Sequence, residues 1–237
     1  MTITQNHNRH PFAGYTIGIL APNLNYEKTL GNVANAETFD FPVLYEVVDI
    51  DLELLFQGDE SLNETIIAAA QKLEASGVRA IIGACGFFAN FQNLLKEAVN
   101  IPVFTSSLLQ VPLIENSLAP NQKIAVFAAN GENIQHALAA AGNTNTDRYV
   151  LVDVNQLEEF APIRYGKKPL DNEALERALS DLAKKTVDSD PSIGAILLEC
   201  SDLPPYAKAV QEKTDLPVFD FLTLINFVHQ AVKQRKY

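Results

Sequence analysis

Cysteine is scarce in this chain, and its scarcity excludes several classes of protein. Only two of the 237 residues are cysteine, Cys85 and Cys200, and they form no Cys-x-x-Cys pair. A disulfide-stabilised scaffold or a zinc knuckle needs more cysteines at closer spacing. We therefore expect neither a structural disulfide nor a metal site, and each thiol requires its own explanation.

Positive charge and long apolar runs are also in short supply. The chain has 18 Lys and Arg against 29 Asp and Glu, a formal net charge of −11. Such a surface repels phosphate backbones and anionic lipids, so we expect no nucleic-acid or membrane-surface role. No stretch approaches the roughly 18 to 20 apolar residues of a membrane span, and the polar segment 1–12 lacks the apolar core of a signal peptide. We expect a cytoplasmic protein that acts on a small molecule.

The chain does contain short apolar runs that alternate with longer amphipathic segments, which is typical of strands separated by helices. Strands are predicted at 16–21, 43–50, 80–83, 103–104, 123–128, 149–152, 195–198 and 218–219. Among the helices between them, one is predicted to begin at Ser61, because Glu64 completes a capping-box spacing. Alternating strands and helices with short connections predict parallel βαβ units. The fold class is therefore α/β.

The two halves of the chain share an unusual spacing. Pro102 follows Cys85 by 17 positions, and Pro217 follows Cys200 by 17 positions. Each proline lies in a matching tetrapeptide of an aliphatic residue, Pro, Val and Phe, and each cysteine comes just after a predicted core strand. We interpret the pattern as two α/β units of related design. The alternative is that βαβ proteins repeat apolar strands in any case.

Two thiols in equivalent places suggest chemistry. Ligands of open α/β sheets bind at the carboxyl ends of the strands, where both Cys85 and Cys200 are predicted. A helix N-terminus there is expected to lower the thiol pKa. Thiols that face each other across a cleft can remove a proton from one face of a carbon and return it on the other. A single cysteine is more often core filling, but the matched pair favours an acid/base role.

Several motifs resemble the aspartate/glutamate racemase superfamily, which includes hydantoin racemases, maleate isomerases and arylmalonate decarboxylases. The motifs are Gly-Ile-Leu-Ala-Pro at 18–22, Ile-Ile-Gly-Ala-Cys at 81–85, Leu-Glu-Cys-Ser-Asp-Leu-Pro at 198–204 and Pro-Val-Phe-Asp at 217–220. The resemblance implies two pseudo-symmetric parallel-sheet α/β domains, with a cofactor-independent active site in the cleft between them and one cysteine from each. By the same resemblance we expect residues 1–112 plus 218–237 to form the first domain, residues 113–217 the second, and the protein to be a possible homodimer.

The function that we expect from this pattern is a racemase or epimerase. Cys85 and Cys200 would be the acid/base pair at a carbon next to the carboxyl or carbonyl group of an amino acid or related small acid. One alternative is a cis-trans isomerase that resembles maleate isomerases and uses a nucleophilic cysteine. Another is a ligand-binding member of the family without turnover. The resemblance to the decarboxylase branch is weaker, because that branch keeps only the second thiol.

The chain departs from the family pattern at two places. In amino-acid racemases of the family, the first cysteine is followed by Asn and then by Thr or Ser, which bind the substrate carboxylate. Here Gly86 and Phe87 follow Cys85, so we expect only their backbone N–H groups to hold an oxyanion. Glu199 stands where the family has glycine. These departures predict a less polar substrate than aspartate or glutamate.

Four polar residues after predicted strands are further candidates for substrate binding. Asn23 and Asn130 lie in equivalent loops, where a turn-forming role is equally expected. Ser201 can donate a hydrogen bond to a substrate oxygen or cap the next helix. Asp202 can cap that helix, or accept from a substrate amine or from a neighbouring thiol, whose pKa an ionised carboxylate would raise. The polar segment 162–169, which contains Arg164, either closes over an anion or is a solvated loop.

Overall fold

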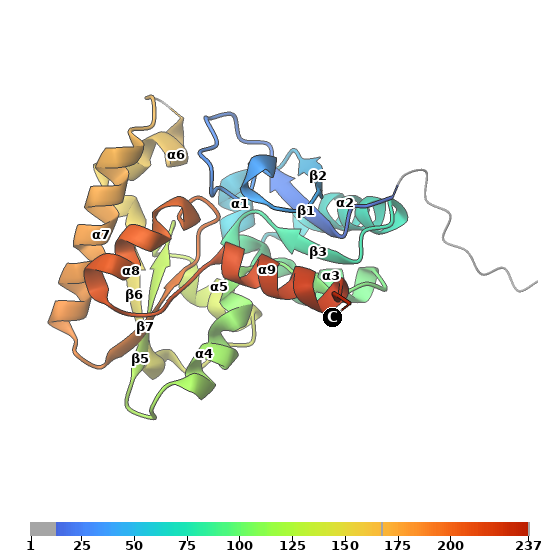
Figure 1. Cartoon of the computed structure of the whole chain (residues 1–237). Coiled ribbons are helices and arrows are strands. Elements are labelled where there is room, and N and C mark those ends of the chain that lie inside the picture. The colour runs from blue at the N-terminus through green and yellow to red at the C-terminus, as the bar shows by residue number, and fades with distance from the viewer. Residues whose placement is uncertain (1–12, 167, 237) are drawn as a thin grey trace, which may run out of the picture.

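The computed structural model describes residues 13–166 and 168–236, which leaves the polar segment 1–12 outside the described residues. The chain forms two four-stranded parallel sheets that lie side by side with helices packed around them (Figure 1). The strand order is β2-β1-β3-β4 in the first sheet and β6-β5-β7-β8 in the second. The α/β class and the two-sheet architecture expected from the sequence are therefore confirmed.

The first sheet has an apolar interior, whose strands are buried on both faces as parallel strands are when helices cover them, and an edge strand with exposed residues. Its elements are β1 (Ile17–Pro22), β2 (Val43–Val48), α1 (Leu52–Gln57), α2 (Asn63–Ala75), β3 (Ala80–Gly83), α3 (Gln92–Ala98) and β4 (Val103–Phe104). β1 is central and pairs with both β2 and β3. All four residues of β3 are buried, so the residue that follows it starts from a rigid position.

The second sheet repeats the arrangement of the first. Its elements are α4 (Val111–Ser117), β5 (Lys123–Ala128), α5 (Ile134–Ala140), β6 (Tyr149–Asp153), α6 (Ala161–Tyr165), α7 (Asn172–Ser189), β7 (Ile193–Leu198), α8 (Ala207–Thr214) and β8 (Val218–Phe219). Strand β7 occupies the place that β3 has in the first sheet. Cys85 follows β3 and Cys200 follows β7, so the two cysteines occupy corresponding positions, as the sequence spacing indicated.

The last helix, α9 (Phe221–Val232), returns to the first sheet (Figure 1). Its buried residues Phe221, Leu224 and Ile225 belong to the same apolar cluster as β1 and β3. Strand β8, just before it, pairs with β7 in the second sheet, although the division expected from the sequence assigns residues 218–219 to the first domain. The domain boundaries at 112 and 217 otherwise stay a prediction.

Some local predictions were wrong for identifiable reasons. The helix expected to begin at Ser61 begins at Asn63 after a 3-10 turn, and the side chain of Asp59 caps that turn by accepting from the Ser61 N–H. The segment between β3 and β4 begins with a 3-10 turn, Gly86–Phe91, and becomes α-helical only at Gln92. None of the helices within the described ranges is long and apolar enough to cross a membrane.

Candidate functional site

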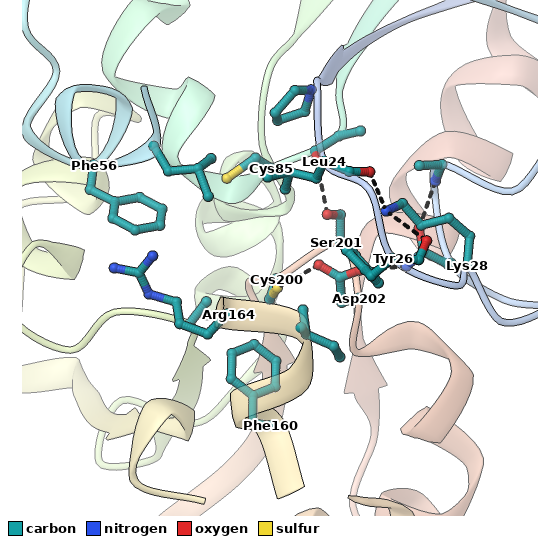
Figure 2. A pocket seen from close by; sticks show the side chains of 17 residues that line it. Leu24, Tyr26, Lys28, Phe56, Cys85, Phe160, Arg164, Cys200, Ser201 and Asp202 are labelled. Carbon is teal, nitrogen blue, oxygen red and sulfur yellow. Dashed lines mark hydrogen bonds between the residues drawn. The ribbon is translucent and has the colours of Figure 1, made fainter. Parts of the chain in front are cut away.

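A narrow pocket that is partly open to solvent lies where the carboxyl ends of both sheets meet, and both cysteines line it (Figure 2). Its wall is formed by Pro22, Leu24, Tyr26, Lys28, Asn32, Ala34, Leu52, Phe56, Ala84, Cys85, Ala129, Phe160, Ile163, Arg164, Cys200, Ser201 and Asp202. Most of these side chains are apolar, so the few charged groups among them decide which polar ligand the pocket accepts.

Cys85 lies at the end of β3 and is partly exposed to the pocket. Burial raises the pKa of its thiol well above the ordinary value, and the nearby Glu199 carboxyl raises it further. The Phe87 N–H and the Arg164 charge act in the opposite direction but do not offset the burial. The expectation that a helix N-terminus lowers this pKa is therefore wrong, because only a short 3-10 segment follows Cys85 and the surroundings are apolar.

Cys200 is buried, and its thiol has a hydrogen-bond partner. The Sγ atom donates to Asp202 Oδ2 at 3.5 Å. Burial raises the pKa of the Cys200 thiol, and Asp202 is the next largest cause. The other oxygen of Asp202 accepts from the Tyr26 hydroxyl and from the Asn32 side-chain amide. The carboxylate is thus held in place by three donors, and it faces the thiol that precedes it by two residues.

The loop between β1 and β2 supplies one side of the pocket. Tyr26 and Lys28 come from this loop and lie beside Asp202 (Figure 2). The Lys28 ammonium is 3.0 Å from the centroid of the Tyr26 ring, a cation–π contact, and it also donates to the Leu24 carbonyl oxygen at 2.9 Å. Burial lowers the pKa of Lys28 to about 8, although Asp202 opposes the change. Sequence reasoning missed these residues, because the loop has no periodic pattern.

Arg164 supplies the positive charge on the opposite side. It comes from α6, in the segment for which the sequence left a solvated loop or an anion-binding role open. The guanidinium pairs with Glu53 and lies 4.7 Å from the centroid of the Phe56 ring. Its Nε atom is buried and has no hydrogen-bond partner among the described residues. The structure therefore places an incompletely satisfied cation against an apolar wall, which is suited to a ligand carboxylate.

Ser201 lines the pocket, but its hydroxyl group donates its hydrogen bond to the protein backbone. Its hydroxyl donates to the Ala84 carbonyl oxygen at 2.9 Å. The backbone carbonyl of Ser201 in turn accepts from the Val33 N–H at 3.2 Å. The hydrogen bond to Ala84 connects the segments that follow β3 and β7, and the expected donation from Ser201 to a substrate oxygen stays a prediction.

The remaining predicted substrate-binding residues lie outside the pocket wall. Asn130 accepts from the Glu132 and Asn133 N–H groups, so it forms the turn that the sequence left as the alternative. The Asn23 side chain is exposed and donates to Asp49 at 3.4 Å. Phe87 is fully buried against Phe56, with the ring centroids 4.6 Å apart. Gly86 is buried against Glu199. The side chains of Asn23, Asn130 and Phe87 do not line the pocket, whereas the expected role of the Gly86 and Phe87 backbone N–H groups in holding an oxyanion stays a prediction.

Glu199 belongs to the site although it was not chosen as a candidate from the sequence. It is fully buried between β7 and Cys200, and its Oε2 atom accepts from the Ala129 N–H at 3.2 Å. The sequence did contain one signal for Glu199, because this residue stands where the family has glycine. Within the described part of the chain, no three His, Cys, Asp or Glu side chains are grouped so that they could hold a metal ion.

The fold and the paired-cysteine pocket define a family. The family description Asp/Glu/Hydantoin racemase matches residues 52–225, and the chain belongs to this family. Solved structures agree at the level of fold. Arylmalonate decarboxylase is 15% identical, with 94% of each chain covered and a TM-score of 0.58. Glutamate racemase from Francisella tularensis, solved with D-glutamate, is 19% identical, with 94% of this chain and 85% of that chain covered and a TM-score of 0.53.

Relatives of higher identity carry a different activity in their names. Dimethylsulfoniopropionate lyase 7 of Emiliania huxleyi (strain CCMP1516) is 32% identical over 223 residues, which cover 89% of this chain and 65% of that protein. The dimethylsulfoniopropionate lyase of Durusdinium sp. clade D is 30% identical over 90% of this chain and 73% of that protein. The chain thus spans somewhat less than two thirds of the length of the first of these relatives.

These relatives overturn the function expected from the sequence. The predicted racemase or epimerase is wrong as a function, because proteins at 30–34% identity over about nine tenths of the chain are named as lyases. The isomerase class is wrong for the same reason, and the alternative that resembles maleate isomerases falls with it. The alternative without turnover is not supported either, since the relatives are named as enzymes. The likeness to racemases concerns the fold.

Proposed function

We propose that this chain is a lyase that cleaves dimethylsulfoniopropionate. This substrate is a small zwitterion, with a carboxylate at one end, a dimethylsulfonio group at the other and two carbons between them. The pocket offers a matching pair of charges. Arg164 lies on one side of the thiols, and Asp202 lies on the other (Figure 2). This charge arrangement carries the proposal together with the names of the relatives.

The charges give the substrate one favoured orientation. Its carboxylate pairs with the guanidinium of Arg164, which lines the pocket. Its sulfonium group then faces the Asp202 side of the pocket, because a carboxylate attracts a cation. Apolar side chains such as Phe160 surround the two methyl groups. The carbon next to the substrate carboxylate lies between the thiols in this orientation.

The reaction is an elimination. A base removes a proton from the carbon next to the carboxylate, and the electron pair of that C–H bond forms the new carbon–carbon double bond. The C–S bond breaks with its electron pair going to sulfur, so that neutral dimethyl sulfide leaves and acrylate remains. No proton has to be returned to carbon, and a neutral leaving group needs no acid. The reaction therefore requires one base, whereas racemisation requires an acid and a base.

We assign the base to Cys200. Its thiol donates to Asp202, which in turn is oriented by Tyr26 and Asn32, the usual arrangement of an activated side chain. In the free protein the raised pKa keeps Cys200 protonated. A bound sulfonium cation favours the thiolate, because an opposite charge stabilises the ionised form. Asp202 receives the thiol proton as the thiolate forms.

The test is direct. The purified chain is incubated with dimethylsulfoniopropionate, dimethyl sulfide is measured in the headspace, and acrylate is measured by proton NMR. We expect both products in equal amounts, and we expect Cys200→Ser to release them at least about a hundredfold more slowly, the usual contribution of a positioned base. A folded wild-type protein that releases no dimethyl sulfide above the buffer rate would contradict the proposal.

The cytoplasmic location expected from the sequence is likewise a proposal. Its support is that both cysteines are free thiols, which is typical of a reducing compartment. Cell fractionation with an antibody to the chain tests it, and recovery in a secreted or membrane fraction would contradict it.

A further inference from the structure

The Glu199 carboxyl group occupies a position that the proposed reaction does not explain. It is fully buried directly before Cys200 in the chain. Its Oε2 atom accepts from the Ala129 N–H, but its Oε1 atom is buried without a hydrogen-bond partner among the described residues. An ionised carboxylate with one unpaired oxygen is costly to bury, whereas a protonated carboxyl is much less so.

The unpaired oxygen lies against the turn that carries the other thiol. A Cβ atom on Gly86 would overlap the Oε1 and Cδ atoms of Glu199, so only glycine leaves room for the carboxyl here. Gly86 directly follows Cys85, and Glu199 directly precedes Cys200. The backbone of Glu199 is also held, since the Ser107 hydroxyl donates to its carbonyl oxygen at 3.2 Å. One rigidly placed carboxyl group is therefore adjacent to both thiols.

We propose that Glu199 is a positioning residue that holds a proton in the active form of the protein, and that it controls the ionisation of both Cys85 and Cys200. A protonated Glu199 adds no charge next to the thiols, so a thiolate can form when substrate binds. An ionised Glu199 adds a negative charge beside both thiols and opposes the thiolate. The consequence for turnover rests on the proposed function, but the effect on the thiols does not.

The electrostatics of the site support this assignment. Burial raises the pKa of Glu199 to about 8; the Ala129 N–H opposes this rise and Asp202 adds to it. The charge on Glu199 raises the pKa of Cys85 and, to a smaller extent than Asp202 does, that of Cys200. Two further charged groups act on Cys85: Asp202 raises its pKa, and Arg164 lowers it. Glu199 therefore loses its proton within the pH range in which the protein can be studied.

The experiment measures Cys85 alone. In a Cys200→Ser background, the alkylation rate of Cys85 by iodoacetamide is followed from pH 6.5 to pH 9.5, with and without Glu199→Gln. Glutamine resembles the protonated carboxyl in shape and charge. We expect equal rates near pH 7 and a rate about tenfold higher with Glu199→Gln near pH 9, because a neighbouring like charge shifts a pKa by about one unit or more. No substrate is involved, so failure here is distinct from failure of the proposed lyase activity.

Two controls make the result specific. Asp220→Asn removes another buried carboxyl, which caps α9, and it should leave the pH dependence of Cys85 alkylation unchanged. Equal rates with and without Glu199→Gln at every pH would overturn the proposal. The proposal would also be overturned if the ratio of the Cys85 alkylation rates with and without Glu199→Gln differed from one by the same factor at every pH. A purely structural effect of the substitution would give such a constant ratio.

A second measurement covers the case in which Glu199→Gln does not fold. Infrared spectroscopy of the Asp220→Asn protein should show the C=O stretch of a protonated carboxylic acid at pH 7, and that band should disappear as the pH rises through about 8. Absence of the band at pH 7 would contradict a proton held by Glu199.

Discussion

The hydroxyl of Ser201 and the carbonyl oxygen of Ala84 lie 2.9 Å apart, so the residue after one thiol is hydrogen-bonded to the residue before the other. Ser201→Ala removes this bond and leaves a buried carbonyl unpaired. We expect the free energy of unfolding, measured in urea, to fall by about 1–3 kcal/mol. The control is Ser76→Ala, whose hydroxyl donates to the Lys72 carbonyl at an exposed site and should cost less than about 0.5 kcal/mol. Equal losses would contradict a connecting role for Ser201.

The two thiols should differ in their effect on turnover. With Cys200 as the base, Cys200→Ser should lower kcat by about two orders of magnitude or more, because serine is a far weaker acid than cysteine. Cys85→Ser should keep more activity, since no carboxylate of residues 13–166 or 168–236 accepts a hydrogen bond from the Cys85 thiol, whereas Asp202 accepts one from Cys200. Initial rates of dimethyl sulfide release measure both. A larger loss with Cys85→Ser would assign the base to the other thiol.

Arg164 should act on substrate binding more than on the chemical step. Arg164→Ala removes the cation that pairs with the substrate carboxylate, and a hydrogen bond to a charged group contributes about 1.5–3 kcal/mol. We therefore expect KM to rise about tenfold to a hundredfold. Arg177→Ala is the matched control, because Arg177 lies in an exposed pair with Glu173 on α7. An unchanged KM with Arg164→Ala would place the substrate carboxylate elsewhere.

Glu199 should make the stability of the protein depend on pH. Burial raises its pKa from 4.5 to about 8 in the folded state, so between these values the folded protein binds a proton that the unfolded chain has lost. The contribution of Glu199 to the free energy of unfolding is therefore largest below pH 4.5, and it declines as the pH rises towards 8. Denaturant unfolding should show a decline on the order of a few kcal/mol from pH 5 to pH 8.

The matched variant for this titration is Glu199→Gln, in which the decline should be much smaller. Glu173→Gln, at an exposed position of α7, should follow the wild-type pH dependence. A wild-type stability that stays level between pH 5 and pH 8, or a decline of the same size in Glu199→Gln, would contradict a raised pKa of Glu199.

Much of the fold was predictable because it is encoded locally. Apolar runs such as that of β7 cannot be stable unless they are covered on both faces, and the amphipathic segments between them provide the cover. The equal spacing of Cys85 and Cys200 from their prolines indicated equivalent places in two sheets. Local signals did not show that Ser61 lies in a 3-10 turn, since the capping side chain there is that of Asp59.

The site was less predictable, because it depends on contacts between distant parts of the chain. Tyr26 and Asp202 are 176 positions apart, and nothing in the loop around Tyr26 indicates that they meet. The direction of the thiol pKa shifts depends on burial, which the local sequence does not show. The racemase function predicted from the sequence was wrong because two thiols around a small acid suit several reactions, and a shared fold does not select among them.

The contact between Gly86 and Glu199 links the two departures from the family pattern. The racemases place a larger side chain after the first cysteine and a glycine before the second, and here the order of sizes is reversed at both positions. The two positions are in contact, and the carboxyl group of Glu199 fills the space that a side chain at position 86 would occupy. A larger residue at position 86 alone would collide with Glu199, and a smaller residue at position 199 alone would leave a void. An engineer who wished to give this chain a racemase-like lining would have to replace both together, and an evolutionary path between the two arrangements must pass through the same reciprocal exchange.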